Sequence, residues 1–128
     1  MIVLDTHAWI WHVASSRKLS GRARKTIHES SEVGVSAISC WELGMLVAKK
    51  RLVLDRDART WMQQALAVAG IELLPLTADI ALRAAEIDSR KLLDPSDRMI
   101  LATAIEHRCP LVTKDTRLRA YGAVPAIW

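Results

Sequence analysis

The sequence predicts an α/β fold in which helices cover both faces of a central, mostly parallel sheet of four to five strands. Short runs of β-branched and aliphatic residues alternate with longer segments of helical periodicity, and tight turns between successive runs are mostly missing. Strands that are separated by helices pair in parallel. The chain has 128 residues, 51% hydrophobic and 25% charged, which suffices for one buried core, so we expect a single domain over residues 1–128.

Five apolar runs are the expected strands. Each is apolar or rich in β-branched residues and is too short for a helix. In chain order they are Met1–Leu4, Val33–Ile38, Ile71–Leu76, Leu111–Thr113 and Val124–Ile127. The last run decides between four strands and five.

Six segments are the expected helices. They are Thr6–Ala14, Ser20–Glu29, Cys40–Lys50, Ala58–Ala69, Thr77–Arg90 and Asp97–His107. The clearest pattern follows Thr77, which suits an N-cap, because apolar residues recur one, four and seven positions after Ile80. That helix therefore has one face to bury.

Composition excludes several classes of protein. The hydrophobic fraction is too high for a disordered chain, and the longest uncharged stretch, Thr60–Ile71, is too short to span a membrane. Asp5 interrupts the opening apolar run, so we expect no secretory signal and a cytoplasmic location. Cys40 and Cys109 are too few for a disulfide framework and have no CxxC spacing, so free thiols are expected.

The net charge of +4 weakly favours a polyanionic partner. Basic residues gather in three places along the chain: Arg17–Lys25, Lys49–Arg51 and Lys114–Arg119. A solvated helix face is the alternative for each cluster taken alone. We expect them to contact phosphates.

Four acidic residues stand at or just after the expected strands. Ligands of open parallel sheets bind beyond the carboxyl ends of the strands, so acids at those places are the candidates for a site. They are Asp5 after the first strand, Glu42 after the second, Asp97 at the start of the last helix and Asp115 after the fourth strand. Parallel strands end at one edge, so these carboxylates are expected to converge.

Each acid also has a structural alternative. The pair Ser39 and Glu42 has the spacing of a capping box, and Asp94 to Asp97 reads as an N-cap with proline at the first helical position. Asp5 alone suits a turn, and Asp115 alone suits an exposed loop. None of these alternatives predicts that all four acids fall at one rim of the sheet among apolar neighbours.

Converging carboxylates predict a metal site. Carboxylates held close in a partly dry cleft repel one another, and the pKa of at least one rises unless a cation neutralises them. Oxygen ligands without a set of histidines or cysteines suit Mg²⁺ or Mn²⁺. Such an ion lowers the pKa of bound water and neutralises a phosphodiester, so phosphodiester hydrolysis is the predicted reaction.

Taken in this order, the motifs resemble the PIN-domain family and, within it, the toxin ribonucleases of bacterial VapBC-type toxin–antitoxin pairs. The similarity covers essentially the whole chain, and it is carried by Met1–His7, Ser36–Leu46, Leu73–Thr77, Asp94–Arg98 and Thr113–Asp115. The resemblance implies a single PIN-like domain with endoribonuclease activity that depends on Mg²⁺ or Mn²⁺ and acts on RNA.

The resemblance also implies a role for each acid. Asp5 and Asp97 match the principal metal ligands, Asp115 matches a third ligand that binds directly or through water, and Glu42 matches an acid that positions the metal or its water. Supporting hydroxyl groups match at Thr6, Ser39 and Thr113. Asp94 is interpreted as the cap of its helix.

Partners are implied in the same way: a cognate antitoxin protein and a homodimer. The segment Trp9, Ile10 and Val13, together with the helix around Cys40–Val47, offers apolar surface for such an interface. The five tryptophans are expected to pack in the core or in an interface rather than to stack on bases, and His7 is expected to face solvent or to cap.

Two other functions stay open at this stage. One is a non-catalytic PIN-fold module that binds RNA or protein. The other is a phosphohydrolase of the dehalogenase-like type with Asp5 as nucleophile, although such enzymes carry a second aspartate where this chain has His7. Metal-dependent cleavage of RNA separates the first alternative from a nuclease.

Overall fold

Five short strands form one fully parallel sheet. The computed structural model describes residues 1–128. Its strands are β1 (Ile2–Leu4), β2 (Val33–Ser36), β3 (Ile71–Leu74), β4 (Leu111–Val112) and β5 (Ala126–Ile127), in the spatial order β3-β2-β1-β4-β5. Every neighbouring pair is parallel. The predicted fold class is confirmed, with the fifth strand present.

Seven helices connect the strands, one more than the sequence predicts. They are α1 (Thr6–Val13), α2 (Gly21–Glu29), α3 (Ala37–Ala48), α4 (Ala58–Leu66), α5 (Ala78–Glu86), α6 (Pro95–Glu106) and α7 (Thr116–Tyr121). The unexpected helix is α7, which is six residues long and buries only Leu118, too little for a periodic pattern. None of the helices has the length and apolar character of a membrane span.

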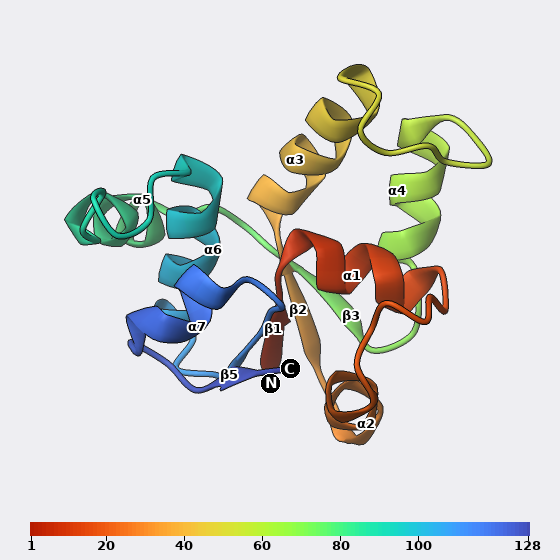
Figure 1. The fold of residues 1–128 in the computed structure, drawn as a ribbon. Coiled ribbons are helices and arrows are strands. Elements are labelled where there is room, and N and C mark those ends of the chain that lie inside the picture. Colours follow the sequence, from red (N-terminus) through yellow and green to blue (C-terminus); the bar gives the residue numbers. More distant parts are fainter.

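The sheet separates two apolar cores. Ile2 and Leu4 of β1 join one core, whereas Val3 between them joins the other, because successive side chains of a strand point to opposite faces. Figure 1 shows α1, α2 and α4 on one side of the sheet and α5, α6 and α7 on the other. Helix α3 contributes to both cores through Leu43 and Ile38.

Several helix boundaries differ from the predicted ones; helix α4, for example, ends at Leu66 rather than Ala69. Helix α3 begins at Ala37 rather than Cys40, because the Ser36 hydroxyl caps it by accepting from the Ile38 N–H. Helix α5 ends at Glu86 rather than Arg90, since Ile87 is already extended. Helix α6 begins before Asp97, at Pro95 after its N-cap.

The chain topology determines where a site can form. The chain starts at the central strand β1, runs outward to β2 and β3, and then returns to β4 and β5 on the other side. Strand β1 therefore lies where the order of the strands reverses: β2 and β3 follow on one side of it, and β4 and β5 on the other. Ligands of open α/β sheets bind at this point, beyond the carboxyl ends of the strands.

Substitution of Gly34, in the middle of β2, tests how closely β2 packs against the side chain of Leu74. A Cβ at this position would lie 2.5 Å from Cδ1 of Leu74, which is almost fully buried and cannot move aside. We expect Gly34→Ala to lower the free energy of unfolding by about 1–3 kcal/mol, measured by urea denaturation. The matched control is Gly44→Ala at an exposed position of helix α3, where a Cβ meets no atom within 4 Å; it should raise stability by up to about 1 kcal/mol. Equal effects at both glycines would contradict this account.

Candidate active site

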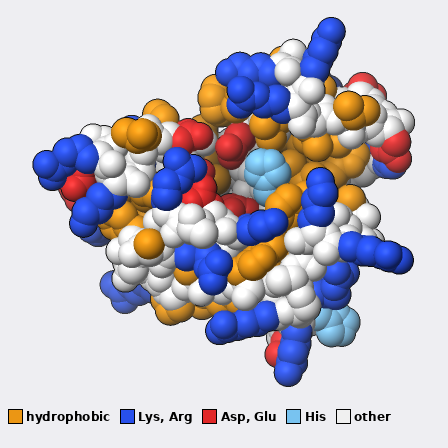
Figure 2. Space-filling view, viewed as in Figure 1, with side chains coloured by type: hydrophobic (Ala, Val, Ile, Leu, Met, Phe, Trp, Pro, Cys, Tyr) orange, Lys and Arg blue, Asp and Glu red, His pale blue; other side chains and the backbone are white.

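The four acids singled out in the sequence line one cavity. It has a volume of about 300 Å³ and lies at the carboxyl edge of the sheet, where Asp5, Glu42, Asp97 and Asp115 meet. Figure 2 shows acidic side chains around a hollow in the middle of this face, with Lys and Arg side chains on its rim. The convergence of these carboxylates is therefore observed.

Asp5 is held at both carboxylate oxygens. It follows β1 and caps α1: its Oδ1 accepts from the Ala8 N–H at 2.8 Å, and its Oδ2 accepts from the Thr113 hydroxyl. Burial raises its pKa to about 6, against the lowering effect of those two donors and of nearby His7. Asp5 is thus both a helix cap and a carboxylate that holds its charge at a cost.

A buried hydroxyl pair positions Glu42. The Thr6 hydroxyl of α1 donates to Glu42 Oε1 and lies 2.9 Å from the Ser39 hydroxyl of α3. All three side chains are buried. Ser39 and Glu42 do not form a capping box, because α3 begins earlier, at Ala37. Their contacts tie α1 to α3 and hold Glu42 at the cavity.

Asp97 is the carboxylate with the least support from the protein. It lies in the first turn of α6 and accepts no hydrogen bond or ion pair. Its pKa is raised to about 7, mainly by burial and then by the negative charges of its neighbours, of which Asp94 contributes most, followed by Glu42, Asp115 and Asp5. A positive charge at this place would stabilise the cavity.

Asp94 belongs to the acidic group as well as to the helix end. Its Oδ1 caps α6 by accepting from the N–H and the hydroxyl of Ser96, at 2.9 and 2.8 Å. Carboxylate oxygens of Glu42, Asp94 and Asp97 also lie within 4.8 Å of one another. The sequence interpretation as a cap alone was incomplete. The three-residue spacing of Asp94 and Asp97 was the available signal, because it places both on one side of a helix.

Asp115 differs from the other acids because donors surround it. It caps α7 by accepting from the N–H groups of Arg117 and Leu118, and it pairs with the Arg117 guanidinium at 3.2 Å. Burial raises its pKa, but these donors lower it by more, so the pKa lies below the usual value. The buried Thr113 hydroxyl connects this turn to Asp5 by accepting from the Asp115 N–H at 3.0 Å.

Part of the cavity is lined by aromatic and basic side chains. The rings of His7 and Trp11 lie 5.5 Å apart, and the Lys114 ammonium lies 5.8 Å from the Trp11 ring centre. The expectation that tryptophans fill the core holds for Trp9 and Trp61, whose rings pack edge to face at 5.6 Å. Trp11 instead borders the cavity.

A family profile described as PIN domain matches residues 2–124. The chain belongs to the PIN-domain family. This PIN domain is 38% identical over 120 residues to Ribonuclease VapC22 of Mycobacterium tuberculosis, covering 94% of this chain and 91% of the relative. The matched residues include every acid of the cavity.

Solved structures agree with the family assignment. The PIN domain is similar to a toxin–antitoxin complex from Klebsiella pneumoniae, with 25% identity, a TM-score of 0.68, and coverage of 97% of this chain and 95% of that one. It is also similar to FitAcB from Neisseria gonorrhoeae, with 26% identity, a TM-score of 0.67, and coverage of 98% and 96%.

The apolar surface of the PIN domain matches the predicted one only in part. Trp9 and Ile10 are buried in the core, where Trp9 packs on Trp61 of α4, although Ile10 and Val13 both line an apolar groove. This groove of about 690 Å³ runs beside α1 and α4, and its lining includes Trp11, Val13, Leu52, Val53, Leu54 and Val68. Val53 is 90% exposed. Trp11 borders both this groove and the acidic cavity.

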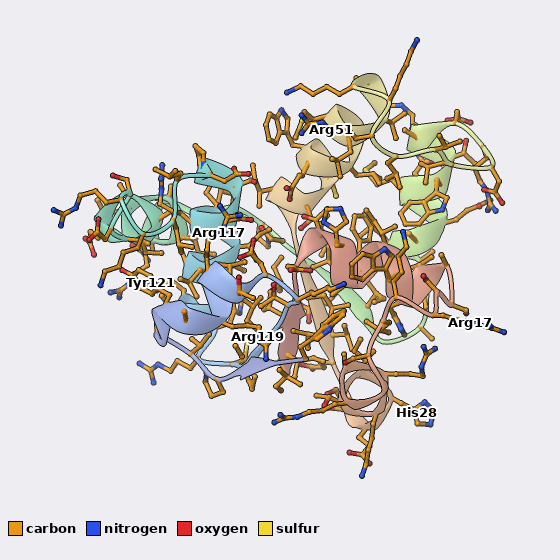
Figure 3. All side chains as sticks on the ribbon, viewed as in Figure 1. Arg17, His28, Arg51, Arg117, Arg119 and Tyr121 are labelled. Carbon is orange, nitrogen blue, oxygen red and sulfur yellow. The ribbon has the colours of Figure 1, made fainter.

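The three basic clusters are not equivalent in space. Lys114 lines the cavity, and Arg117 beside it is paired with Asp115. Figure 3 shows Arg17 and His28 pointing outward at the edge of the view. Arg24 donates to the backbone carbonyls of Ser16 and Leu19, so it supports a turn. Of the residues in the three clusters, Lys114 is the one that lines the cavity.

The raised pKa of Asp5 predicts how stability depends on pH. A folded-state pKa of about 6 against an ordinary 3.8 means that the folded chain holds more proton than the unfolded one between about pH 4 and 6, so this group lowers stability as pH rises. In EDTA at pH 8, the Asp5→Asn variant should therefore be as stable as the unmodified protein or more stable. At pH 5 its stability relative to the unmodified protein should be lower than at pH 8. Asparagine still caps α1 but loses one accepted hydrogen bond, at a cost of about 1 kcal/mol.

The control is Asp57→Asn, which changes the exposed N-cap of α4. Hydrogen bonds from Thr60 lower the pKa of Asp57, so its stabilising contribution is lost only in more acid solution. The measurement is the melting temperature of each variant minus that of the unmodified protein. This difference should be the same at pH 5 and pH 8 for Asp57→Asn, whereas for Asp5→Asn it should change between the two pH values. A marked loss of stability in Asp5→Asn at pH 8 would show that its structural role outweighs the charge.

Proposed function

We propose that this PIN domain is a divalent-metal-dependent endoribonuclease, the toxin of a VapBC-like type II toxin–antitoxin pair, with the acidic cavity as its active site. The observation that carries the proposal is the group of carboxylates around Asp97, which accepts no hydrogen bond and faces four acidic neighbours. The similarity to a protein named Ribonuclease VapC22, along almost all of both chains, supports RNA as the substrate.

The residues of the cavity fit Mg²⁺ or Mn²⁺. The cluster around Asp97 offers carboxylate oxygens within 4.8 Å of one another, the hard ligands that these ions prefer. We assign Asp5 and Asp97 as principal ligands, Asp115 as a third ligand, direct or through water, and Glu42 as the acid that positions the ion or its water. When bound, the ion supplies a more acidic water and neutralises the phosphodiester.

The side chains around the acids hold them in place. Thr113 and the Ala8 N–H direct the two oxygens of Asp5, and Thr6 fixes Glu42 from the neighbouring helix. Preorganised ligands need no rearrangement when charge develops on the phosphate. Lys114 at the rim supplies positive charge for the RNA backbone.

Two alternative functions fit the site less well. A non-catalytic binding module has no need for buried, mutually repelling carboxylates, whose pKa values are raised at Asp5 and Asp97. A phosphohydrolase with Asp5 as nucleophile needs a free carboxylate oxygen, whereas both oxygens of Asp5 accept hydrogen bonds and the residue is only 9% exposed. His7 also stands where that chemistry requires an acid.

A cognate antitoxin is the proposed protein partner. The solved structure at 25% identity is named as a toxin–antitoxin complex. The apolar groove beside α1 and α4 is the surface we assign to such a partner, because it exposes Val53 and meets the acidic cavity at Trp11. A homodimer, which the resemblance implies, stays a prediction.

Replacement of Asp97 tests the activity. Purified protein with Mn²⁺ or Mg²⁺ should cleave RNA, EDTA should stop the cleavage, and Asp97→Asn should lower the rate about 100-fold or more, because several kcal/mol of charge stabilisation depend on the ion. Cleavage is measured by gel electrophoresis of end-labelled RNA. The matched control is Asp79→Asn, an acid in the first turn of α5 that lies outside the cavity and should leave the rate unchanged. Activity that survives both EDTA and Asp97→Asn would contradict the proposal.

Metal binding should compete with protons. Because the pKa values of Asp5 and Asp97 are about 6 and 7, Asp97 is mostly protonated and Asp5 about half protonated at pH 6, whereas both are ionised at pH 8. The affinity for Mn²⁺ should therefore be about tenfold or more weaker at pH 6 than at pH 8, and binding near pH 7 should release protons. Calorimetry in two buffers of different ionisation enthalpy measures both quantities. An affinity independent of pH would place the ion elsewhere.

A further inference from the structure

The acidic cavity is bordered by a tryptophan at the edge of the core. Trp9 and Trp61 fill the apolar centre beneath α1, whereas Trp11, two residues further along the same helix, is only partly buried and lines the cavity. Lys114, the residue directly before Asp115, lines the same cavity and is exposed. We call Trp11 and Lys114 the aromatic-basic wall.

Residues from three parts of the chain hold the Trp11 ring. His7 lies one helical turn before it, with ring centres 5.5 Å apart. The ring centres of Trp11 and Trp128, the last residue, are 5.8 Å apart, and the Lys114 ammonium lies 5.8 Å from the centre of the Trp11 ring. Side chains packed on several sides lose little conformational freedom when a ligand arrives. The wall is therefore organised before any substrate binds.

We propose that Trp11 stacks on one nucleobase next to the scissile phosphate and that Lys114 contacts the adjoining phosphate, so that the aromatic-basic wall positions the RNA at the acids. This inference rests on the proposed ribonuclease function. Bases stack on aromatic side chains whatever their identity, and a cation beside the aromatic ring pairs with the phosphate of the same nucleotide. RNA carries these two groups in every repeating unit.

Charge favours RNA over a protein partner on this side of Trp11. The indole also borders the apolar groove, but its other flank has the Lys114 ammonium and the His7 ring. An ammonium attracts an anionic ligand and repels a basic one. Lys114 directly precedes Asp115 in the chain, and both residues line the acidic cavity. A phosphate bound to Lys114 would therefore lie at the rim of the cluster of acids.

The test is a double-mutant cycle between Trp11 and single bases of the substrate. The unmodified holoenzyme with Mn²⁺ first maps a cleavage site on RNA; oligonucleotides with that site then receive one abasic ribose at each flanking position. At one position, loss of the base should lower kcat/KM of the unmodified protein by about 5- to 150-fold, mainly through KM. Trp11→Leu should show a similar loss on intact RNA and no further loss at that abasic position.

The matched control is Trp41→Leu, which removes an indole that is 59% exposed on α3 and outside the cavity. It should give the same abasic profile as the unmodified protein. The proposal would be overturned if an abasic ribose lowered kcat/KM equally in Trp11→Leu and in the unmodified protein. It would also be overturned if the abasic ribose no longer lowered kcat/KM in Trp41→Leu. If the unmodified holoenzyme cleaves no RNA, the proposed function itself fails.

Two further variants keep the proposal testable if Trp11→Leu does not fold. Trp11→Phe retains a smaller ring and should show the abasic loss at the same position with reduced size. Lys114→Gln changes an exposed side chain; it should weaken RNA binding at every sequence and lower the slope of log affinity against log salt by about 1. An unchanged abasic loss in Trp11→Phe or an unchanged salt slope in Lys114→Gln would overturn the corresponding half of the proposal.

Discussion

Repulsion among carboxylates at the carboxyl edge of the sheet is the constraint on which this molecule depends. Asp5, Glu42, Asp94, Asp97 and Asp115 are drawn to one place by strands and helices that start or end there. The protein supplies donors to most of them, but the Asp97 carboxylate receives none. Folding therefore leaves unbalanced negative charge around Asp97 and raises its pKa to about 7, at the place where we propose that a cation binds.

Helix capping and the chemistry of the site use the same residues. Asp5, Asp94 and Asp115 are the N-caps of α1, α6 and α7, so three helix N-termini begin at this edge. Their free N–H groups and the positive ends of their dipoles stabilise nearby negative charge. The structural and functional interpretations of these acids are thus complementary, since the caps that begin the helices also hold carboxylates at the cavity.

Helix α1 joins one of the two cores to the site through its periodicity. Trp9 points to the core and packs on Trp61, whereas Trp11 turns to the cavity and lies beside Lys114. Thr6, in the first turn, contacts Glu42 on α3. One short helix therefore connects the apolar interior, the acids and the surface on which a substrate is proposed to lie.

The sequence by itself determined the fold class, four strands with a fifth left open, and the four acids that meet at one edge. Strand and helix periods are local properties, and parallel strands must end on the same side of their sheet, so the convergence of Asp5 and Asp115 follows from alternation alone. Only the tertiary structure decided that Asp94 joins Glu42 and Asp97, that Ser39 faces Thr6 rather than capping a helix, that α7 forms, and that Trp11 lines the cavity at the edge of the core. These features depend on the angles and depths at which helices pack on the sheet, and such packing is decided by contacts between segments far apart in the chain.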